Sequence, residues 1–404
     1  MLNQKQQEAY DAVTKQNHQI VTLIGGPGTG KSYTTAAIIR NIFAKVLVTA
    51  TTHAAKDNLA KMARHKVITT QAAMGFILMR DNYKMKLAQV NPPKSTDLLI
   101  VEEISMLPVL VYKAILVAIE EGRIGKVLFL GDPLQLPSVD KSVDVATIPG
   151  LHITLTEQKR QDKADTSTLD YLDKLRQAIA DGEDLPSLKE LDNIHTYQKH
   201  DEFANAYLSS VENKVVLAYR NKVVDKYNAA IHAGDNQFNK GDIVILDKPL
   251  SNGKFTIANN GAAVSITEIK QDPKYPRLII SVITTAGAKS ILHFWTSKSE
   301  LEDILEKLKE DEQEEQYWEI ADNSFRLKHE YASTVFKAQG KSITEVFIDA
   351  ADMWSAHSAK PSKYNHPINK DMFLRLLYVA ISRMELKAHL FIGSIRSYSY
   401  FEGD

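Results

Sequence analysis

Short apolar runs alternate with helix-forming stretches along the first third of the chain. The runs cover 20–24, 46–50, 98–101 and 127–130, and polar sequence follows each of them. Runs of this length without polar alternation are typical of strands buried on both faces of a sheet. The pattern therefore predicts an α/β fold with a parallel sheet, whose ligand-binding groups would collect beyond the carboxyl ends of its strands.

The same pattern returns in the second half of the chain. Strands are expected at 214–219, 346–348 and 389–392, with a helix at 221–231. These segments predict a second α/β lobe.

The pattern of apolar residues changes between the two parts of this second lobe. Short apolar stretches at 241–246, 263–266 and 278–282 are divided by turn residues, and an acidic helical segment follows at 301–318. Several short strands spaced by turns are typical of a small antiparallel barrel. We therefore expect a β-barrel insertion with one appended helix.

Composition narrows the class of protein. The 404 residues are enough for roughly two to four domains, and no apolar run approaches the ~20 residues of a bilayer span. The chain has no cysteine, so disulfides and cysteine-bound zinc are excluded. Its start is polar, and we expect a cytoplasmic protein from a bacterial or phage-infected cell. The net charge of −1 argues against nucleic-acid binding by overall attraction, although a local basic groove would suffice.

The segment GGPGTGKS at 25–32 fits the phosphate-loop pattern G-x-x-x-x-G-K-[ST], between a predicted strand and a predicted helix at 32–43. Glycines allow successive backbone N–H groups to point at phosphate oxygens. Lys31 can reach the β- and γ-phosphates, and the Ser32 hydroxyl can hold Mg²⁺. A glycine-rich turn that binds nothing is disfavoured by this context. The predicted nucleotide contacts here are Gly26, Pro27, Gly28, Thr29, Gly30, Lys31, Ser32 and Tyr33.

Further motifs follow in a fixed order. They are TTHAAK at 51–56, VEEISM at 101–106, GDPLQLPS at 131–138, LTEQKR at 155–160, YASTVFKAQG at 331–340 and YVAISR at 378–383. In this order they resemble the motifs of superfamily-one helicases, in the RecD/Dda-like branch. The resemblance extends over nearly the whole chain and implies two RecA-like lobes that use ATP and Mg²⁺.

The resemblance assigns the nucleotide chemistry to residues of several motifs. Ser32 and Glu102 would hold Mg²⁺, although Glu102 stands where the family usually has aspartate. Glu103 would polarise the attacking water. The other implied residues are Gln6 at the adenine, Gln135 as γ-phosphate sensor, Arg160 and Arg383 at the γ-phosphate, and Gln339 and Gly340 beside it. For Gln6 a purely structural role at the start of a helix stays open, and Gln135 can equally be read as a surface amide.

The resemblance also implies contacts with single-stranded DNA. These would come from Thr52, His53, Lys56, Thr334 and Lys337, and from Tyr83 and Met85 in a strand-separating pin at 71–95. Side chains of these types can bind phosphates or stack on bases without reading sequence. An ordinary connecting loop is the alternative interpretation of 71–95.

The implied architecture divides the chain into four parts. Lobe 1A covers 1–70 and 96–157, the pin insertion 1B covers 71–95, lobe 2A covers 158–235 and 325–404, and an SH3-like insertion 2B with the acidic helix covers 236–324.

The implied activity is ATP-dependent unwinding of DNA by 5′-to-3′ movement along a single strand. Tailed or forked duplexes would be the substrates, single-strand-binding or replication proteins are possible partners, and a monomer is expected. The alternative is a DNA-stimulated ATPase that displaces bound proteins without unwinding. A P-loop kinase would leave the motifs at 334–340 and 376–383 unexplained, and a non-catalytic binding module has only the Glu102 departure in its favour.

Overall fold

The structure, a computed structural model, divides into two compact units. The first comprises Met1–Ile77, Gln89–Val223 and Ser333–Asp404, and the second comprises Leu78–Ala88 and Val224–Ala332. The residues described are 2–41, 45–52, 55–56, 59–60, 64–137, 143–157, 166–188, 191–232, 237–251, 256–357 and 368–393. None of the helices among them combines the length and the apolar content that a bilayer span requires.

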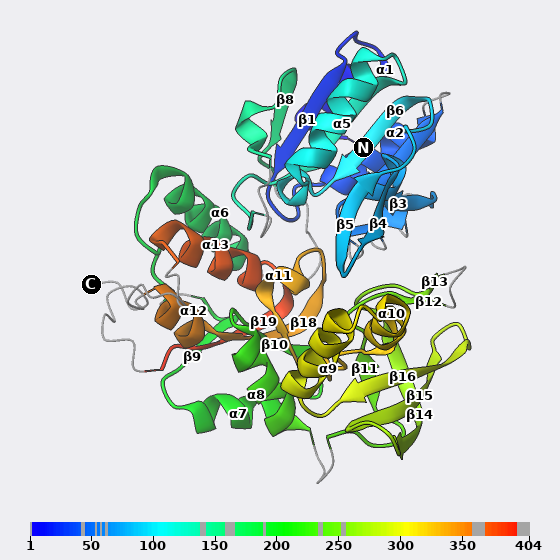
Figure 1. Ribbon diagram of the computed structural model, residues 1–404. Coiled ribbons are helices and arrows are strands. Elements are labelled where there is room, and N and C mark those ends of the chain that lie inside the picture. The colour runs from blue at the N-terminus through cyan, green and yellow to red at the C-terminus, as the bar shows by residue number, and fades with distance from the viewer. Residues whose placement is uncertain are drawn as a thin grey trace. The chain divides into compact units, whose positions relative to one another are not determined.

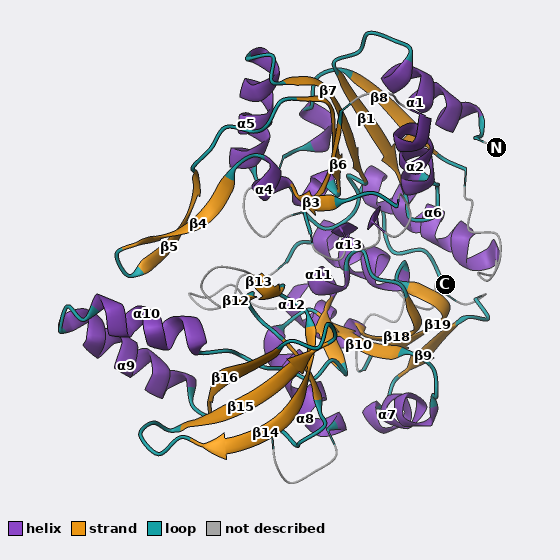
Figure 2. Ribbon diagram, turned by 90° about the vertical axis from the view of Figure 1, so that its right-hand side faces the viewer, coloured by secondary structure: helices purple, strands orange, loops and turns teal. Residues whose placement is uncertain are grey.

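A six-stranded parallel sheet forms the amino-terminal part of the first unit, in the order β3-β2-β6-β7-β1-β8 (Figure 1). Its strands are β1 (Ile20–Gly25), β2 (Val46–Ala50), β3 (Val67–Thr69), β6 (Thr96–Glu102), β7 (Ile124–Gly131) and β8 (Leu151–Leu155). Helices α1 (Gln4–Thr14) and α2 (Lys31–Asn41) pack on one face, and α5 (Val109–Glu120) lies on the other (Figure 2). The parallel sheet predicted from the apolar runs is confirmed.

A second sheet in the same unit has the order β17-β10-β18-β19-β9. Its strands are β9 (Ile194–Tyr197), β10 (Lys214–Ala218), β17 (Ala332–Thr334), β18 (Ile343–Asp349) and β19 (Met384–Phe391), and the pairs β10–β18, β18–β19 and β19–β9 are parallel. The helices of this part are α6 (Thr166–Asp181), α7 (His200–Ser209), α11 (Val335–Ala338), α12 (Ala350–His357) and α13 (Lys370–Ile381). Residues 376–381 of α13 are all buried, as expected of a helix that is apolar on every side. Polar groups of this helix, such as the Tyr378 hydroxyl, consequently lie in the interior of the unit.

The second unit contains the antiparallel strands. Its larger sheet has the order β11-β14-β15-β16, from β11 (Ile243–Ile245), β14 (Ala263–Gln271), β15 (Arg277–Thr284) and β16 (Lys289–Trp295). A separate pair is formed by β12 (Leu250–Ser251) and β13 (Thr256–Ala258). Helix α8 (Asn221–Ile231) precedes these strands at the bounds predicted from sequence. Antiparallel strands are present where a β insertion was expected, and their SH3-like character stays a prediction.

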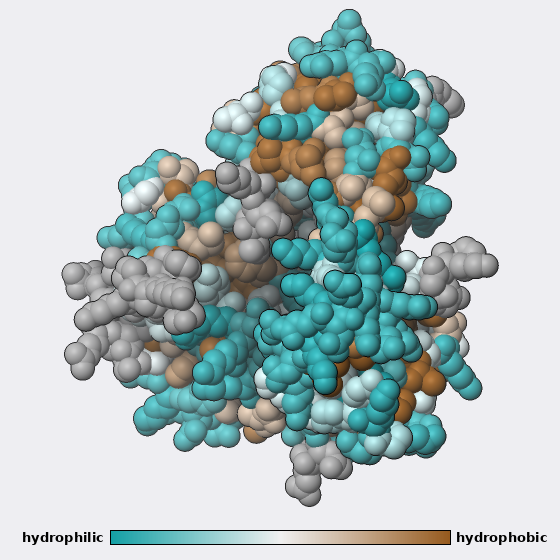
Figure 3. All heavy atoms as spheres, in the orientation of Figure 1, coloured by the Kyte–Doolittle hydropathy of each residue, from teal (hydrophilic) through white to brown (hydrophobic). Residues whose placement is uncertain are grey.

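The single acidic helix expected at 301–318 is wrong. Two helices form instead, α9 (Lys298–Glu310) and α10 (Glu314–Asn323), and together they present a hydrophilic surface (Figure 3). Glu312 between them has a φ of 53°, in the left-handed region that a right-handed helix cannot continue through. Backbone N–H groups of 311–313 turn back to the last carbonyls of α9, which ends the helix. Periodicity alone did not reveal this break because the charged residues continue across it.

The segment 71–95 contains a short helix, α4 (Thr70–Ala73), and a hairpin. Its strands are β4 (Phe76–Asp81) and β5 (Lys84–Gln89), joined by a turn at Asn82 and Tyr83. Asn82 has a φ of 52°, which asparagine tolerates better than most residues. The role of this hairpin as a pin stays a prediction.

Candidate functional site

The phosphate loop joins β1 to α2, as the sequence predicted. Gly28 and Gly30 have φ angles of 84° and 87°, a region that side chains with a β-carbon rarely adopt. Lys31 Nζ donates to the carbonyl oxygens of Gly25 at 2.7 Å and Gly26 at 3.1 Å. The ammonium group is therefore held at the loop by two neutral acceptors. A phosphate oxygen would be a stronger, charge-assisted partner for it.

Gln6 is tied to this loop through both ends of its amide. Its Oε1 accepts from the backbone N–H of Asn3 at 3.0 Å, completing a capping box at the start of α1. Its Nε2 donates to the carbonyl oxygen of Thr29 at 3.2 Å, and the residue is buried. The structural role left open by the sequence is therefore present. Reading of adenine by Gln6 stays a prediction and would require the amide to exchange partners. Tyr33, in the first turn of α2, is half exposed.

Two carboxylates follow one another at the end of β6. Ser32 Oγ donates to Glu102 Oε1 at 3.2 Å, whereas Glu102 Oε2 is buried and has no hydrogen-bond partner. Burial, together with the neighbouring charge of Glu103, raises the pKa of Glu102 to about 7. Burial also raises the pKa of Glu103, while Lys31 and Arg383 oppose that rise. Glu103 adopts a left-handed φ of 59°, a conformation that costs roughly 1–3 kcal/mol and is concentrated at functional sites.

The residues at this strand end fit a magnesium ion. A buried carboxylate oxygen without a partner costs free energy until a donor or a cation satisfies it. Magnesium takes oxygen ligands, and it usually binds through one or two carboxylates plus substrate phosphates. Ser32 Oγ and Glu102 would supply two of these oxygens. Glu102 has one methylene more than the aspartate that is usual at this position of the motif. Its carboxylate nevertheless lies within hydrogen-bond distance of Ser32 Oγ.

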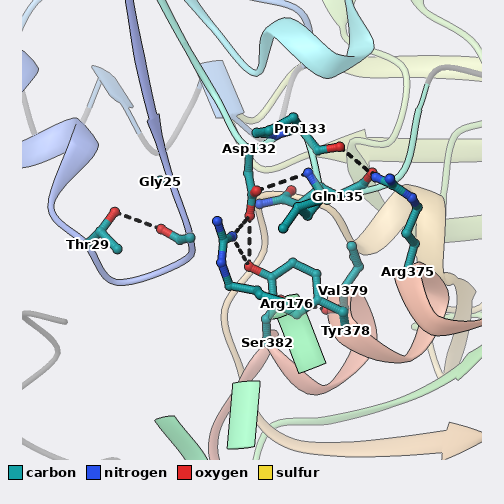
Figure 4. Close-up of polar contacts among 12 residues, drawn as sticks. Gly25, Thr29, Asp132, Pro133, Gln135, Arg176, Arg375, Tyr378, Val379 and Ser382 are labelled. Carbon is teal, nitrogen blue, oxygen red and sulfur yellow. Dashed lines mark hydrogen bonds and ion pairs between the residues drawn. The ribbon is translucent and has the colours of Figure 1, made fainter. Parts of the chain in front are cut away.

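Asp132, directly after β7, is fully buried and binds two side chains from distant parts of the chain (Figure 4). Arg176 Nη1 of α6 lies 2.5 Å from Asp132 Oδ2, and the hydroxyl of Tyr378 on α13 donates to the same oxygen at 2.8 Å. Arg176 Nη1 also donates to the Tyr378 hydroxyl at 2.7 Å. A β-carbon added to Gly26 would lie 3.0 Å from Arg176 Nη1, so the guanidinium lies beside the phosphate loop. We call Asp132, Arg176 and Tyr378 the interlobe triad.

Sequence reasoning missed the interlobe triad. Asp132 and Tyr378 lie inside recognised motifs, but no role was assigned to either, and Arg176 lies in no motif. The available signal was an arginine next to Leu175 on the apolar face of a helix. Burial lowers the pKa of a guanidinium, but the charge of Asp132 and the Tyr378 hydroxyl more than compensate and raise the pKa of Arg176. Its positive charge is therefore retained at the loop.

Helix α13 also holds the segment that follows Asp132. Arg375 Nη1 donates to the carbonyl oxygens of Pro133 at 2.6 Å and Gln135 at 3.0 Å (Figure 4). The Gln135 side chain is buried, and its Oε1 has no partner. Gln339, after α11, is likewise buried, and neither Oε1 nor Nε2 has a partner. Gln135 is therefore a buried amide, and the alternative interpretation of a surface amide is wrong.

Only one of the two predicted γ-phosphate arginines, Arg383, lies in the described part of the chain. Arg383, after α13, is buried, and its Nε donates to the carbonyl oxygen of Val379 at 3.2 Å. Its positive charge opposes the rise in the pKa of Glu103. Arg160 lies outside the described residues, as does His53 of the predicted DNA contacts.

Four of the other predicted DNA contacts lie at helix starts. Thr52 Oγ1 accepts from the backbone N–H of Ala55 at 3.2 Å. Thr334 Oγ1 accepts from the backbone N–H of Lys337 at 3.4 Å and caps α11. Lys56 and Lys337 lie in these same helical turns. The two threonines therefore have local structural roles, and their contact with DNA stays a prediction.

The hairpin tip is anchored within the second unit. Trp318 Nε1 of α10 donates to the carbonyl oxygen of Asn82 at 3.0 Å, and the rings of Tyr83 and Tyr317 meet edge to face at 5.0 Å. Arg80 of β4 pairs with Asp322, while Met85 on β5 is 50% exposed. Of the two predicted tip residues, the tyrosine is thus packed against a helix and the methionine is open to solvent.

Comparisons with known proteins agree with this geometry. A family model described as an AAA domain matches residues 1–199. The chain is 31% identical to the ATP-dependent RecD2 DNA helicase of Deinococcus radiodurans over 167 residues, 40% of this chain but only 22% of that relative. It is 23% identical to the ATP-dependent DNA helicase dda of Enterobacteria phage T4, over 95% of this chain and 97% of that one. Among solved structures, the Pif1 helicase from Bacteroides bound to ADP-AlF3 and single-stranded DNA shares the fold, with a TM-score of 0.55 at 16% identity over 100% of this chain and 95% of that chain.

Proposed function

From its similarity to the RecD/Dda-like superfamily-one helicases, we propose that the chain is a DNA helicase driven by ATP hydrolysis. The observation that carries the proposal is a set of unsatisfied buried groups. Glu102, Gln135 and Gln339 each bury polar side-chain atoms without a partner, and each belongs to a motif that the resemblance assigns to the nucleotide. Such atoms are rare in folded proteins, and a ligand is one way to satisfy them.

In this proposal Ser32 and Glu102 would hold Mg²⁺, which would supply positive charge to offset that of the phosphates. Lys31 leaves its two carbonyl acceptors and takes the β- and γ-phosphates. Glu103 accepts a proton from the attacking water, for which its carboxylate must be ionised. The charges of Lys31 and Arg383 favour that ionised form.

The arginines are proposed to respond to the charge that develops on the γ-phosphate. Arg383 and Arg160 would stabilise it, as positioned arginines do in other phosphoryl transfers. Arg176 is already beside Gly26 and held by Asp132, so an incoming phosphate would compete with this carboxylate for the guanidinium. Binding and release of nucleotide would in this way alter the contact between the end of β7 and helices α6 and α13.

The DNA side of the proposal follows the resemblance. Thr52, His53, Lys56, Thr334 and Lys337 would hold the backbone of a single strand, and the hairpin with Met85 would meet the duplex. Movement is proposed to run 5′-to-3′ on tailed or forked DNA, with the protein acting as a monomer. The four-part division into 1A, 1B, 2A and 2B, with 2B SH3-like, is part of the same proposal.

A DNA-stimulated ATPase that moves along DNA without unwinding it is the second candidate. It would use the same nucleotide residues, and the two candidates differ only in what the hairpin does. The packing of Tyr83 against Tyr317 favours the helicase, because a hairpin anchored at its tip can resist the load of a duplex.

Two assays test the proposal. ATP hydrolysis is measured with and without single-stranded DNA, with Lys31→Ala as the inactive control, and strong stimulation by DNA is expected. Unwinding is then followed on 5′-tailed and 3′-tailed duplexes, with ATP and with a non-hydrolysable analogue. Unwinding of only the 5′-tailed duplex and only with ATP is expected. Hydrolysis without any strand separation would favour the second candidate, and no effect of DNA on hydrolysis would refute both.

A further inference from the structure

Two histidines and an aspartate converge in the second unit, away from the nucleotide residues. His232 follows α8, Asp242 precedes β11, and His329 lies in the segment between α10 and β17. The Nε2 atoms of His232 and His329 lie 3.7 Å and 3.9 Å from Asp242 Oδ2. The three atoms all lie within 4.8 Å of one another. Three segments of the chain therefore present nitrogen and oxygen atoms to one point.

The imidazoles of this cluster are buried and suited to donate lone pairs. The side chains of His232 and His329 are 8% and 7% exposed. The Nδ1 atom of His232 is buried without a hydrogen-bond partner. The proton of the neutral ring can occupy this atom, which leaves the lone pair of His232 Nε2 to face Asp242.

Each ligand atom of the cluster has a neutral hydrogen-bond partner that an ion would have to replace, and Asp242 Oδ2 accepts from the backbone N–H of Asn239 at 2.7 Å. His329 Nε2 lies 3.1 Å from the carbonyl oxygen of Gln237, and the side-chain amide of Asn239 lies 3.2 Å from His232 Nε2. Neither histidine comes within 3.5 Å of the Asp242 carboxylate, so the pairs are longer than hydrogen bonds. The spacing is thus too wide for direct bonding and leaves room for an atom between the groups.

The spacing fits a small divalent transition-metal ion. From the three distances, a point equidistant from the ligand atoms lies at most about 2.5 Å from each of them, and zinc binds imidazole nitrogen and carboxylate oxygen at about 2.0–2.2 Å. The two rings are now stacked at 4.1 Å between centroids, so they must turn apart for both nitrogens to face the ion. A contraction of a few tenths of an ångström completes the site.

We propose that His232, Asp242 and His329 form a binding site for a zinc-like transition-metal ion. Imidazole and carboxylate together suit Zn²⁺, whereas Mg²⁺ prefers an all-oxygen set. The ligands come from the segments that lead into and out of the antiparallel sheet, so the bound ion joins these segments. Its role is structural: it stabilises the second unit, independently of nucleotide and DNA.

The experiment uses the full chain without an added histidine tag and without nucleotide. Binding of Zn²⁺ is measured by calorimetry, and Co²⁺ serves as an absorbing substitute whose visible bands report nitrogen and oxygen ligands. Because the chain has no cysteine, thiolate bands cannot confuse the spectrum. We expect one ion per chain, a rise in the melting temperature with Zn²⁺, and no competition from Mg²⁺.

Three variants locate the ion. His329→Asn and Asp242→Asn should each weaken Zn²⁺ binding by roughly 10- to 100-fold or more. His18→Asn, at an exposed histidine before β1, is the matched control and should bind like the unmodified chain. If a ligand variant does not fold, as judged by circular dichroism, the Co²⁺ spectrum of the unmodified chain still decides the question. Absence of Co²⁺ bands in the unmodified chain, or equal binding by the ligand variants, would overturn the proposal.

Discussion

Replacement of Glu102 by glutamine should stabilise the nucleotide-free protein at alkaline pH while weakening its binding of magnesium and nucleotide. The buried carboxylate has one oxygen bound to Ser32 and one without a partner. Glutamine keeps an acceptor for the Ser32 hydroxyl and removes the buried negative charge. The variant therefore separates two effects of the Glu102 carboxylate. One is the loss of folding stability in the nucleotide-free protein, and the other is the gain in affinity for magnesium nucleotide.

The magnitude follows from the pKa of Glu102. Its rise from 4.5 to about 7 means that the folded state binds the proton more tightly than the unfolded state does. At about 1.4 kcal/mol per pH unit, ionisation of the folded protein costs about 3 kcal/mol. The protonated carboxyl therefore contributes to the free energy of unfolding. This contribution is fully present below pH 4.5 and is lost as the pH rises to about 7. The advantage of glutamine over glutamate should therefore grow between these pH values and stay constant above them.

The assay is thermal unfolding between pH 5 and 8.5, without magnesium or nucleotide. At roughly 2–4 °C per kcal/mol, Glu102→Gln should melt up to about 10 °C above the unmodified chain at pH 8 and close to it at pH 5. Glu120→Gln, at an exposed position on α5, is the matched control and should show no such pH dependence. A difference in melting temperature that is equal at pH 5 and pH 8 would refute the reasoning. Binding of magnesium nucleotide by Glu102→Gln should be weaker at every pH.

Three further predictions concern the site and the hairpin. Glu103→Gln should lower ATP turnover by roughly 10²–10⁴-fold with nucleotide binding retained, and hydrolysis at the normal rate would remove Glu103 from its role. Tyr378→Phe should destabilise the first unit by roughly 1–3 kcal/mol, because its hydroxyl serves both Asp132 and Arg176; an unchanged denaturant midpoint would contradict the interlobe triad. Met85→Ala should slow unwinding more than it slows DNA-stimulated ATP hydrolysis, and an equal loss of both activities would discard the pin.

The sequence by itself determined the central strands of the two sheets and the phosphate loop between β1 and α2, whereas β3, β8, β9 and β17 were not predicted. Buried parallel strands are continuous apolar runs, and the loop is a local pattern of glycines before a helix, so both can be recognised within a few residues. The order of the motifs also revealed the resemblance to superfamily-one helicases, and the similarity to the RecD2 and dda helicases agrees with it. The pair Glu102 and Glu103 was located in the same way, at the end of a strand that could be read directly.

Only the tertiary structure decided which distant residues meet. Arg176 and Tyr378 are 202 residues apart, and Tyr378 and Asp132 are 246 apart, yet they form one hydrogen-bonded group beside Gly26. The cluster of His232, Asp242 and His329 was equally invisible in the sequence. The physical reason is that periodicity reports which face of an element is buried, whereas the partner of a buried polar group depends on how the sheets and helices are connected and packed.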